Sequence, residues 1–354
     1  MFIENPHRSV GPRTASLQLP AGWYLIALTS DLRPGEVRTR RLGGEDVVLF
    51  RTASGKAVAM SPWCPHLGAH LGQGGVVVGE QIRCPFHGFC FDQTGTCTST
   101  PYDGQRPPRV KAGAIPLMEQ NGFILVWFDP AGRAPWFEVP AFDMEGWPPF
   151  RTWRTRLRSH PQEISENAVD VGHFSFLHGY ENVRLVAPVT TDGAVLTTSY
   201  ALERNADLFG RPGNNIKTGF TVNLYGVGYN QIVSHAANFG LHTRIVVLQT
   251  PTDDDHIELT LAITVRLEDR RMLHPVLALI PNSWAHGMVQ RAAMLGFRRD
   301  VSQDLVMWQN KQFLPAPGIA VGDGPIDAYR AWCRQFYAPT QTDTADTLQP
   351  AAAE

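Results

Sequence analysis

The chain has 354 residues, with 31 Lys and Arg against 33 Asp and Glu and a formal net charge of −2 at pH 7. This length allows two domains, and 43% hydrophobic with 18% charged residues is a globular composition. Because Lys and Arg form no basic stripe, neither nucleic acid nor an anionic membrane surface is indicated as a partner. The sequence has no apolar run of about 18 residues and no signal peptide, so we expect a soluble, cytoplasmic protein without a membrane span.

The first part of the chain predicts an irregular arm followed by a β domain. We expect the arm over residues 1–20 and the domain over residues 21–135. From Gly22 onward, short apolar segments alternate with glycine-containing turns, which is typical of an all-β domain. The apolar segment FILVWF at 123–128 is its predicted last strand.

Two loops of this domain carry Cys and His at regular spacing. Cys64 and His66 form C-x-H in the first loop, and Cys84 and His87 form C-x-x-H in the second. A Rieske [2Fe–2S] cluster takes two thiolates on one iron and two imidazoles on the other, and each loop supplies one of each. Zinc is the alternative, but its usual spacing pairs Cys with Cys and His with His. The pattern therefore favours a one-electron [2Fe–2S] cluster.

A Pro- and Gly-containing stretch at 129–150 separates this domain from a second one, predicted over residues 136–338. Long segments with one apolar face predict antiparallel strands, and the pattern becomes helical from about Pro281. The polar, small residues at 339–354 predict a disordered tail.

The second domain contains the pattern D-x-x-H-x4-H, formed by Asp170, His173 and His178. Two imidazoles and a distant carboxylate make a facial triad that leaves iron(II) open positions. In an ideal helix, residues five apart diverge by about 140°, so we expect a local π-type widening, which the glycines Gly172 and Gly179 allow. The alternative is a partly buried helix that carries two histidines and a solvated aspartate.

The third ligand must come from a distant segment. Asp304 is the first candidate, because it lies among apolar residues such as Leu305 and Trp308, where an unbound carboxylate is costly to bury. Asp300, one turn earlier, is the second candidate. The alternative for both is an exposed helical aspartate.

With these motifs, the chain resembles the terminal oxygenase component of Rieske non-haem iron oxygenases, from residue 22 to residue 337. The segments ENAVDVGHFSFLH, QD-x-x-MW and DGP…RQFY resemble most the steroid-directed branch, which includes 3-ketosteroid 9α-hydroxylase oxygenases and cholesterol 7-desaturases. The resemblance implies an α+β protein, with an all-β Rieske [2Fe–2S] domain followed by a helix-grip catalytic domain of antiparallel sheet and helices. It also implies a homotrimer in which the cluster of one subunit reduces the iron of its neighbour.

The resemblance assigns two further residues. Asp170 would link an iron-ligating histidine to His66 or His87 of the neighbouring subunit, and Asn167 would lie near the iron without ligating it. Four residues of 219–230 are candidates for an apolar substrate pocket, with ordinary sheet core as the alternative. They are Phe220, Val222, Leu224 and Tyr229.

The predicted function is activation of O2 by mononuclear Fe(II) for hydroxylation or desaturation of a hydrophobic, steroid-like substrate. The chain has no dinucleotide-binding G-x-G-x-x-G, so electrons from NAD(P)H must arrive through a separate flavin-dependent reductase, a ferredoxin, or both. One alternative is a small aromatic substrate that undergoes O- or N-demethylation or arylamine oxidation. The other is a Rieske electron-transfer or lipid-binding protein without oxygenase activity.

Overall fold

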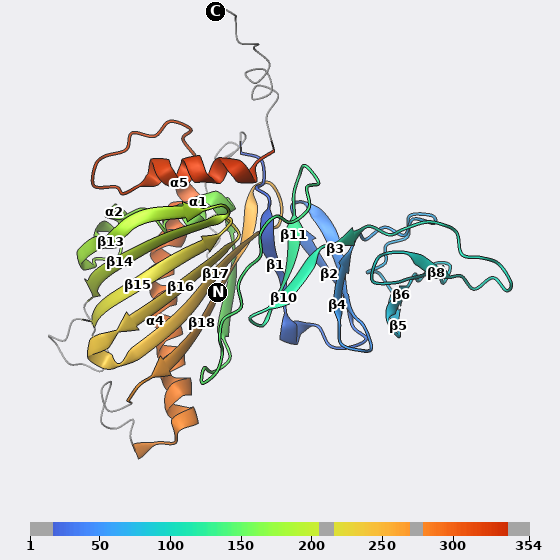
Figure 1. Cartoon of the computed structure of the whole chain (residues 1–354), viewed down its shortest axis with the longest axis horizontal. Coiled ribbons are helices and arrows are strands. Elements are labelled where there is room, and N and C mark those ends of the chain that lie inside the picture. Colours follow the sequence, from blue (N-terminus) through green and yellow to red (C-terminus); the bar gives the residue numbers. More distant parts are fainter. Residues whose placement is uncertain (1–16, 205–215, 270–278, 339–354) are drawn as a thin grey trace, which may run out of the picture.

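The structure is a computed structural model and is described for residues 17–204, 216–269 and 279–338 (Figure 1). Residues 1–16 of the predicted arm and the whole predicted tail at 339–354 lie outside the described residues. Within the described ranges, all paired strands are antiparallel and form four sheets.

The first half of the chain contains three small sheets and no α-helix among its described residues. Their orders are β1-β11-β10, β2-β3-β4-β9 and β5-β6-β7-β8. The strands are β1 (Gly22–Leu28), β2 (Val37–Leu42), β3 (Glu45–Arg51), β4 (Ala57–Met60), β5 (Val76–Val78), β6 (Gln81–Arg83), β7 (Cys90–Phe91), β8 (Cys97–Ser99), β9 (Ala114–Ile115), β10 (Leu117–Gln120) and β11 (Phe123–Phe128), with a 3₁₀ turn η1 (Thr29–Asp31) after β1.

Strand β1 is apolar throughout because both of its faces are covered. Tyr24 and Ile26 pack against the sheet of β2, β3 and β4. Trp23 and Leu25, on the opposite face, pack against the second half of the chain. Alternating side chains of one strand thus contribute to two cores, which explains why the segment does not alternate between apolar and polar residues.

The second half is one seven-stranded sheet of order β12-β18-β17-β16-β15-β14-β13, crossed by a long helix (Figure 1). Its strands are β12 (Arg151–Arg158), β13 (Glu181–Asp192), β14 (Val195–Arg204), β15 (Ile216–Tyr225), β16 (Tyr229–Ala236), β17 (Leu241–Pro251) and β18 (His256–Leu267). Its helices are α1 (Pro161–Glu166), α2 (Gly172–Phe176), α4 (Asn282–Asn310) and α5 (Ile326–Cys333), with 3₁₀ turns η2 (Ala237–Phe239) and η4 (Arg334–Phe336).

Helix α4 packs across one face of this sheet. Val289 and Met294 of the helix contact Ile263 and Val265 of β18, and Val301 packs further along the same face. An antiparallel sheet that wraps a long helix, preceded by an all-β half, confirms the predicted α+β class with a helix-grip second part.

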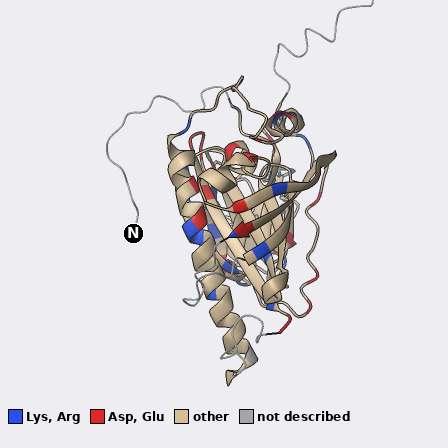
Figure 2. Ribbon diagram, turned by 90° about the vertical axis from the view of Figure 1, so that its left-hand side faces the viewer, with Lys and Arg blue, Asp and Glu red and all other residues tan. Residues whose placement is uncertain are grey.

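On the side of the molecule seen in Figure 2, Lys and Arg are interspersed with Asp and Glu over α4 and the sheet. In the part of the chain that the structure describes, no helix has the length and apolar character needed to cross a membrane.

Candidate active site

The segment between β12 and β13 begins with a buried helix. Helix α1 starts at Pro161, and the Nδ1 atom of His160 accepts a hydrogen bond of 3.2 Å from the Gln162 N–H. All six residues of α1 are buried. Proline at the first helical position costs no hydrogen bond, because that N–H has no partner in a helix.

The two histidines of the D-x-x-H-x4-H pattern do not share one helix. Helix α2 ends at Phe176, so the expectation of a single helix carrying both was wrong. The carbonyl of His173 accepts from the N–H of Leu177 at 2.9 Å and of His178 at 3.4 Å, and the second is the wide, π-type bond. Gly179, at φ +68°, then turns the chain away. The imidazole centroids are 5.2 Å apart.

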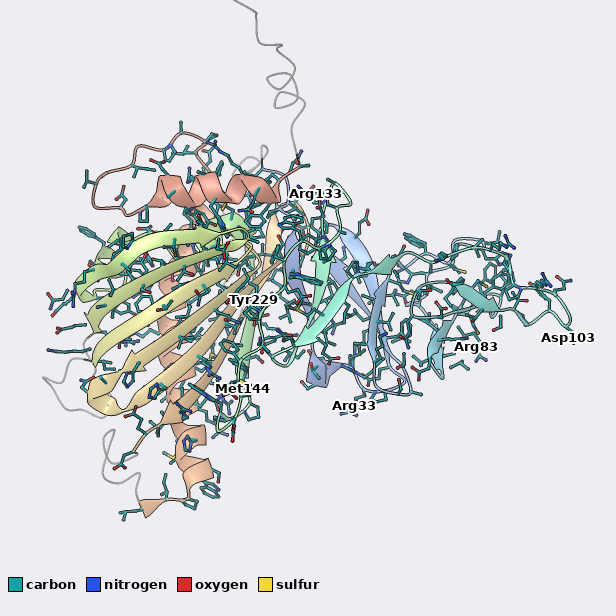
Figure 3. All side chains as sticks on the ribbon, viewed as in Figure 1. Arg33, Arg83, Asp103, Arg133, Met144 and Tyr229 are labelled. Atoms are coloured by element: carbon teal, nitrogen blue, oxygen red, sulfur yellow. The ribbon has the colours of Figure 1, made fainter. Side chains whose placement is uncertain are left out.

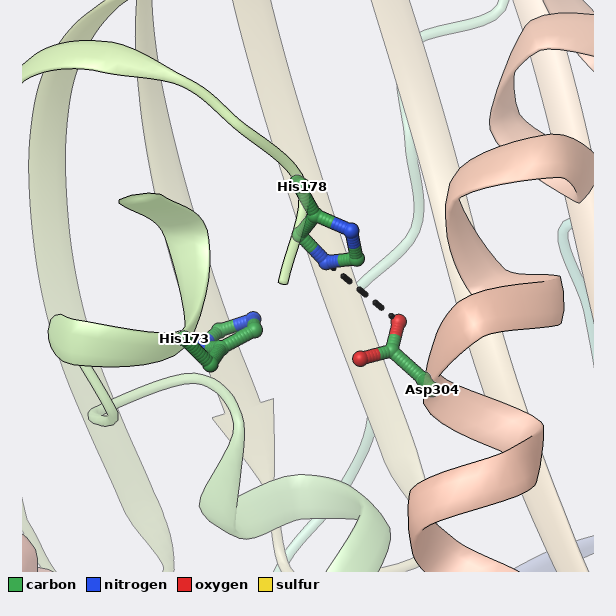
Figure 4. Close-up of side chains that lie close together, drawn as sticks. All are labelled: His173, His178 and Asp304. Atoms are coloured by element: carbon green, nitrogen blue, oxygen red, sulfur yellow. Dashed lines mark ion pairs between the residues drawn. The ribbon is translucent and has the colours of Figure 1, made fainter. Parts of the chain in front are cut away.

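Helix α4 brings Asp304 to these histidines (Figure 4). One ligand atom from each of His173, His178 and Asp304 lies within 4.8 Å of the others, and His178 Nε2 is 3.5 Å from Asp304 Oδ2. Asp300 is engaged elsewhere: its Oδ2 accepts a 2.7 Å hydrogen bond from the Tyr180 hydroxyl and lies 3.3 Å from Arg204 Nη1. The geometry therefore favours Asp304 over Asp300 as the third ligand.

Both imidazoles are held by their Nδ1 atoms. His173 Nδ1 donates to the Asp170 carbonyl at 2.6 Å, and His178 Nδ1 donates to Gln303 Oε1 at 2.9 Å. A proton fixed on Nδ1 leaves Nε2 with its lone pair free for a metal. Sequence reasoning did not identify Gln303, because nothing in its position next to Asp304 marks it as a partner of a histidine 125 residues away.

The Asp304 carboxyl is buried, and burial raises its pKa to about 6 although His178 and His173 act in the opposite direction. Asn167, the residue after α1, donates from Nδ2 to Asp304 Oδ1 at 3.1 Å and accepts from Trp308 Nε1 at 3.3 Å. A buried carboxylate beside two imidazoles with free Nε2 atoms is a donor set that suits iron(II), whose charge offsets the cost of burial.

Asp170 lies at the edge of this site. Its Oδ1 accepts the His173 N–H at 3.1 Å, and its side chain is one-third exposed. Burial raises its pKa, but the hydrogen bonds and charge of His173 outweigh this, so the pKa is lower than usual. The carboxylate is thus ionised and accessible from outside the chain.

The triad faces a cavity of about 780 Å³ between the sheet and α4. Two of the four candidate pocket residues, Phe220 and Val222, line it. Further apolar lining residues are Ile164, Leu202, Ile232, Ile245, Val247, Leu261, Ile263, Val289 and Val301.

The other two pocket candidates do not line this cavity. Leu224 shares the face of Val222 but is covered by Tyr329 and Trp332 of α5. Tyr229 lies on the opposite face, toward β1 and β11 (Figure 3), where its hydroxyl accepts from Asn121 Nδ2 at 3.1 Å. The reason is register: Tyr229 pairs with Tyr225 and so shares the face of Tyr225, not that of Leu224.

The two cysteine loops of the first half have the same backbone design. The Cys64 carbonyl accepts the Gly68 N–H at 2.9 Å, and the Cys84 carbonyl accepts the Gly88 N–H at 3.1 Å. Both glycines have positive φ, +74° and +71°, which permits the tight turn. Equal turns place Cys64 and Cys84 in equivalent positions, whereas His66 is two residues after its cysteine and His87 three residues after its own.

The four side chains of these loops fit a Rieske cluster. Cys64 and Cys84 are buried, whereas the rings of His66 and His87 are partly exposed, with centroids 4.9 Å apart. Burial and the neighbouring Cys84 raise the pKa of the Cys64 thiol to about 11. The Cys64 thiol therefore becomes a thiolate far more readily with the charge of a bound metal beside it.

Comparison with known families finds a match for each half of the chain. Residues 22–116 match the family described as Rieske [2Fe-2S] domain, and residues 126–337 match the 3-ketosteroid 9alpha-hydroxylase C-terminal domain. The chain belongs to this steroid-directed family of Rieske oxygenases. The predictions of a Rieske [2Fe–2S] domain and of a non-haem iron oxidoreductase are thereby confirmed.

Curated relatives of this Rieske oxygenase align over most of its length. Cholesterol 7-desaturase nvd 1 of Ciona intestinalis is 29% identical, over 90% of this chain and 68% of the relative. The oxygenase component of a 3-ketosteroid-9-alpha-monooxygenase of Rhodococcus rhodochrous is 27% identical, over 97% of this chain and 90% of the relative.

Solved structures share the fold. Caffeine-bound NdmA of Pseudomonas putida CBB5 has a TM-score of 0.65 at 18% identity, covering 88% of this chain and 89% of the other. Dicamba-bound dicamba monooxygenase has a TM-score of 0.59 at 19% identity, covering 93% of this chain and 98% of the other.

Proposed function

We propose that this chain is a terminal oxygenase that hydroxylates or desaturates a steroid-like substrate. The observation that carries the proposal is that His173, His178 and Asp304 face an apolar cavity of about 780 Å³. This volume is within the range of small-molecule sites, and the strands and α4 supply apolar walls. Curated relatives are a cholesterol desaturase and a 3-ketosteroid monooxygenase, which supports a steroid nucleus as the occupant.

In this proposal, His173, His178 and Asp304 hold one Fe(II). Bound iron(II) supplies activation of O2 for attack on a C–H bond. Asp170 and Gln303 keep the imidazole Nε2 atoms turned inward, and Asn167 keeps one carboxylate oxygen occupied. The apolar walls exclude water and hold a substrate carbon next to the site.

The electron supply is part of the same proposal. The [2Fe–2S] ligands are Cys64, His66, Cys84 and His87. The partly exposed histidine edge suits one-electron transfer to and from the cluster. Electrons reach it from NAD(P)H through a separate flavin-dependent reductase or a ferredoxin, since the chain carries no dinucleotide-binding fingerprint. A cytoplasmic location stays a prediction from the sequence.

The proposed assembly is a homotrimer with electron transfer between subunits. The strands β5, β6 and β8 next to the cluster loops lie at one end of the longest axis, and α2 lies near the other end (Figure 1). In a trimer, the cluster of a neighbouring subunit can lie closer to the iron site than the cluster of the same chain. The partly exposed carboxylate of Asp170, next to His173, is the proposed bridge to His66 or His87 of that neighbouring subunit.

Mixed assemblies test this arrangement. Cys84→Ser removes the cluster and His173→Ala removes the mononuclear iron, so each variant alone is inactive. Co-produced chains should regain activity if electrons cross between subunits and stay inactive if they do not. Asp170→Asn, which keeps both metal sites, should lower steady-state turnover while leaving iron content and the cluster spectrum unchanged.

A single turnover tests the reaction and the substrate. The protein is reduced chemically without oxygen and mixed with sterols, 3-ketosteroids, aryl ethers and arylamines, labelled O2 is admitted, and products are analysed by mass spectrometry. We expect a steroid carrying the label, or an unlabelled steroid two hydrogens lighter for desaturation. A labelled or demethylated aromatic product would instead establish the small aromatic alternative, and no product at full iron loading would contradict the oxygenase proposal.

A further inference from the structure

A second group of potential metal ligands lies on the sheet, separate from the active-site triad. It consists of His235 on β16, His242 on β17 and Glu268, which directly follows β18. One ligand atom from each lies within 4.8 Å of the others. None of the three lines the cavity.

Strand register explains the placement. His235 and His242 are directly opposite each other in the β16–β17 pairing, as are Ser234 and Thr243. Ser234 and Thr243 face the cavity, and alternation therefore turns both histidines to the outer face of the same strands. The N–H of Glu268 donates to the Gly240 carbonyl at 2.9 Å, which fixes the start of the segment after β18 beside β17.

The three side chains converge on a single atom. Glu268 Oε1 lies 2.6 Å from His242 Nε2 and 3.6 Å from His235 Nε2. The two rings are stacked, with centroids 4.2 Å apart and an angle of 6° between planes. Both imidazoles present Nε2 to the same carboxylate, so two nitrogen donors and one oxygen donor lie together on the outer face of the sheet.

The surroundings leave room for an ion. Gly219, which pairs with His235 from β15, has no side chain, and a Cβ built there meets only the Tyr200 carbonyl at 3.9 Å. Arg266 pairs with His242 from β18, but its guanidinium lies over the Trp147 ring, 5.1 Å from the centroid. Arg266 thus packs on an aromatic ring, although its charge still acts on the Glu268 carboxylate and helps to lower the pKa of that group.

We propose that His235, His242 and Glu268 bind a divalent transition-metal ion, of which zinc(II) is the expected occupant. Two imidazoles and one carboxylate, with water in the fourth position, are a common ligand set for zinc(II), and Ni(II) and Cu(II) suit the same nitrogens. Mg²⁺ and Ca²⁺ prefer oxygen ligands and are not expected here. Binding displaces the proton between His242 Nε2 and Glu268 and joins three strands whose other face forms the cavity wall.

Zinc binding to the iron-loaded protein tests the proposal. Equilibrium dialysis against zinc(II) is followed by analysis of zinc and iron, with Mg²⁺ in a parallel sample. The variants are His242→Ala and Glu268→Gln. The matched control is His256→Ala, because His256 Nδ1 pairs with Asp253 Oδ1 at 3.0 Å and, among the residues that the structure describes, the other ion-pair partner of that carboxylate is Arg156 and not a histidine.

We expect the native chain and His256→Ala to bind one zinc ion without loss of iron and to show a higher thermal midpoint in zinc. In His242→Ala and Glu268→Gln we expect zinc affinity to fall by about tenfold or more. Loss of a residue that only hydrogen-bonds to a metal ligand already lowers metal affinity by about this factor, and loss of the ligand itself should lower it at least as much. The Rieske absorption spectrum reports that each variant is folded. Equal zinc uptake by all four proteins, zinc uptake only with loss of iron, or no zinc uptake would overturn the proposal.

Discussion

The hydrogen bond of 3.1 Å from Asn167 Nδ2 to Asp304 Oδ1 decides which carboxylate oxygen of Asp304 faces the histidines. The other oxygen, Oδ2, lies 3.5 Å from His178 Nε2. Asn167 is itself held by Trp308, one turn further along α4 than Asp304. A residue after α1 thus orients a carboxylate on α4, and the two segments that supply the site are tied together.

Asn167→Ala should weaken iron binding at the mononuclear site. Without the Asn167 amide, the buried Oδ1 atom of Asp304 loses this hydrogen bond and the carboxylate can rotate. We therefore expect the affinity for Fe(II) to fall by about 10- to 100-fold. Fe(II) titration of the apo site measures this, with the Rieske spectrum as an internal reference. Asn310→Ala is the control, because Asn310 is exposed at the end of the same helix, where its Nδ2 donates to the Val306 carbonyl. Equal affinities in the two variants would contradict this role.

Asp304→Asn and Asp300→Asn distinguish the two candidate third ligands. An amide is a poor ligand for Fe(II), so Asp304→Asn should lower the iron content from about three to about two per chain, the two of the cluster. Asp300→Asn weakens the ion pair with Arg204 and should keep all iron. Metal analysis together with the cluster absorption gives both counts. Loss of iron in Asp300→Asn alone would reverse the assignment.

The sequence predicted those parts of the site that depend on local spacing. The four cluster ligands and His173 with His178 lie in two short segments, and the expected widening between the histidines is present as the bond between the His178 N–H and the His173 carbonyl. Asp304 was the first candidate because an aspartate amid apolar helix residues needs a partner, and the structure brings it next to both histidines. The apolar segments also indicated the α+β class and the sheet.

What the sequence did not predict depends on long-range register. Gln303 acquires its role only because α4 passes His178. Tyr229 was assigned to the pocket, but the hairpin between β15 and β16 pairs it with Tyr225 and turns it to the other face. Helix α2 also ends at Phe176, three residues before Gly179, where the sequence allowed a helix that continues through His178.

Filling the cavity should block catalysis without disturbing the metals. Val222 is buried in the cavity wall, and Val222→Trp places a large ring where the substrate would lie. We expect kcat/KM to fall by about tenfold or more, equivalent to about 1.4 kcal/mol or more, with unchanged iron content. The control is Tyr229→Phe, which removes the hydroxyl bonded to Asn121 and should cost about 1 kcal/mol of stability but keep kcat/KM. If Tyr229→Phe loses activity and Val222→Trp does not, the substrate binds elsewhere.

His160 should make the stability of the chain depend on pH. It is 1% exposed, its Nδ1 accepts from the Gln162 N–H and its Nε2 donates to the Gln18 carbonyl at 3.2 Å. Burial lowers its pKa to about 4, although the bond to Gln18 acts in the opposite direction. In the unfolded chain the imidazole has its ordinary pKa of about 6.5.

Between pH values of about 6.5 and 4, the unfolded chain therefore takes up a proton at His160 that the folded chain does not. The free energy of unfolding should fall as the pH is lowered through this window, by at most about 3 kcal/mol. Urea unfolding at several pH values measures the slope. His160→Gln keeps a side chain that can donate and accept but cannot titrate, so its slope should be smaller. The same slope in His160→Gln as in the native chain would show that this histidine is not buried in its neutral form.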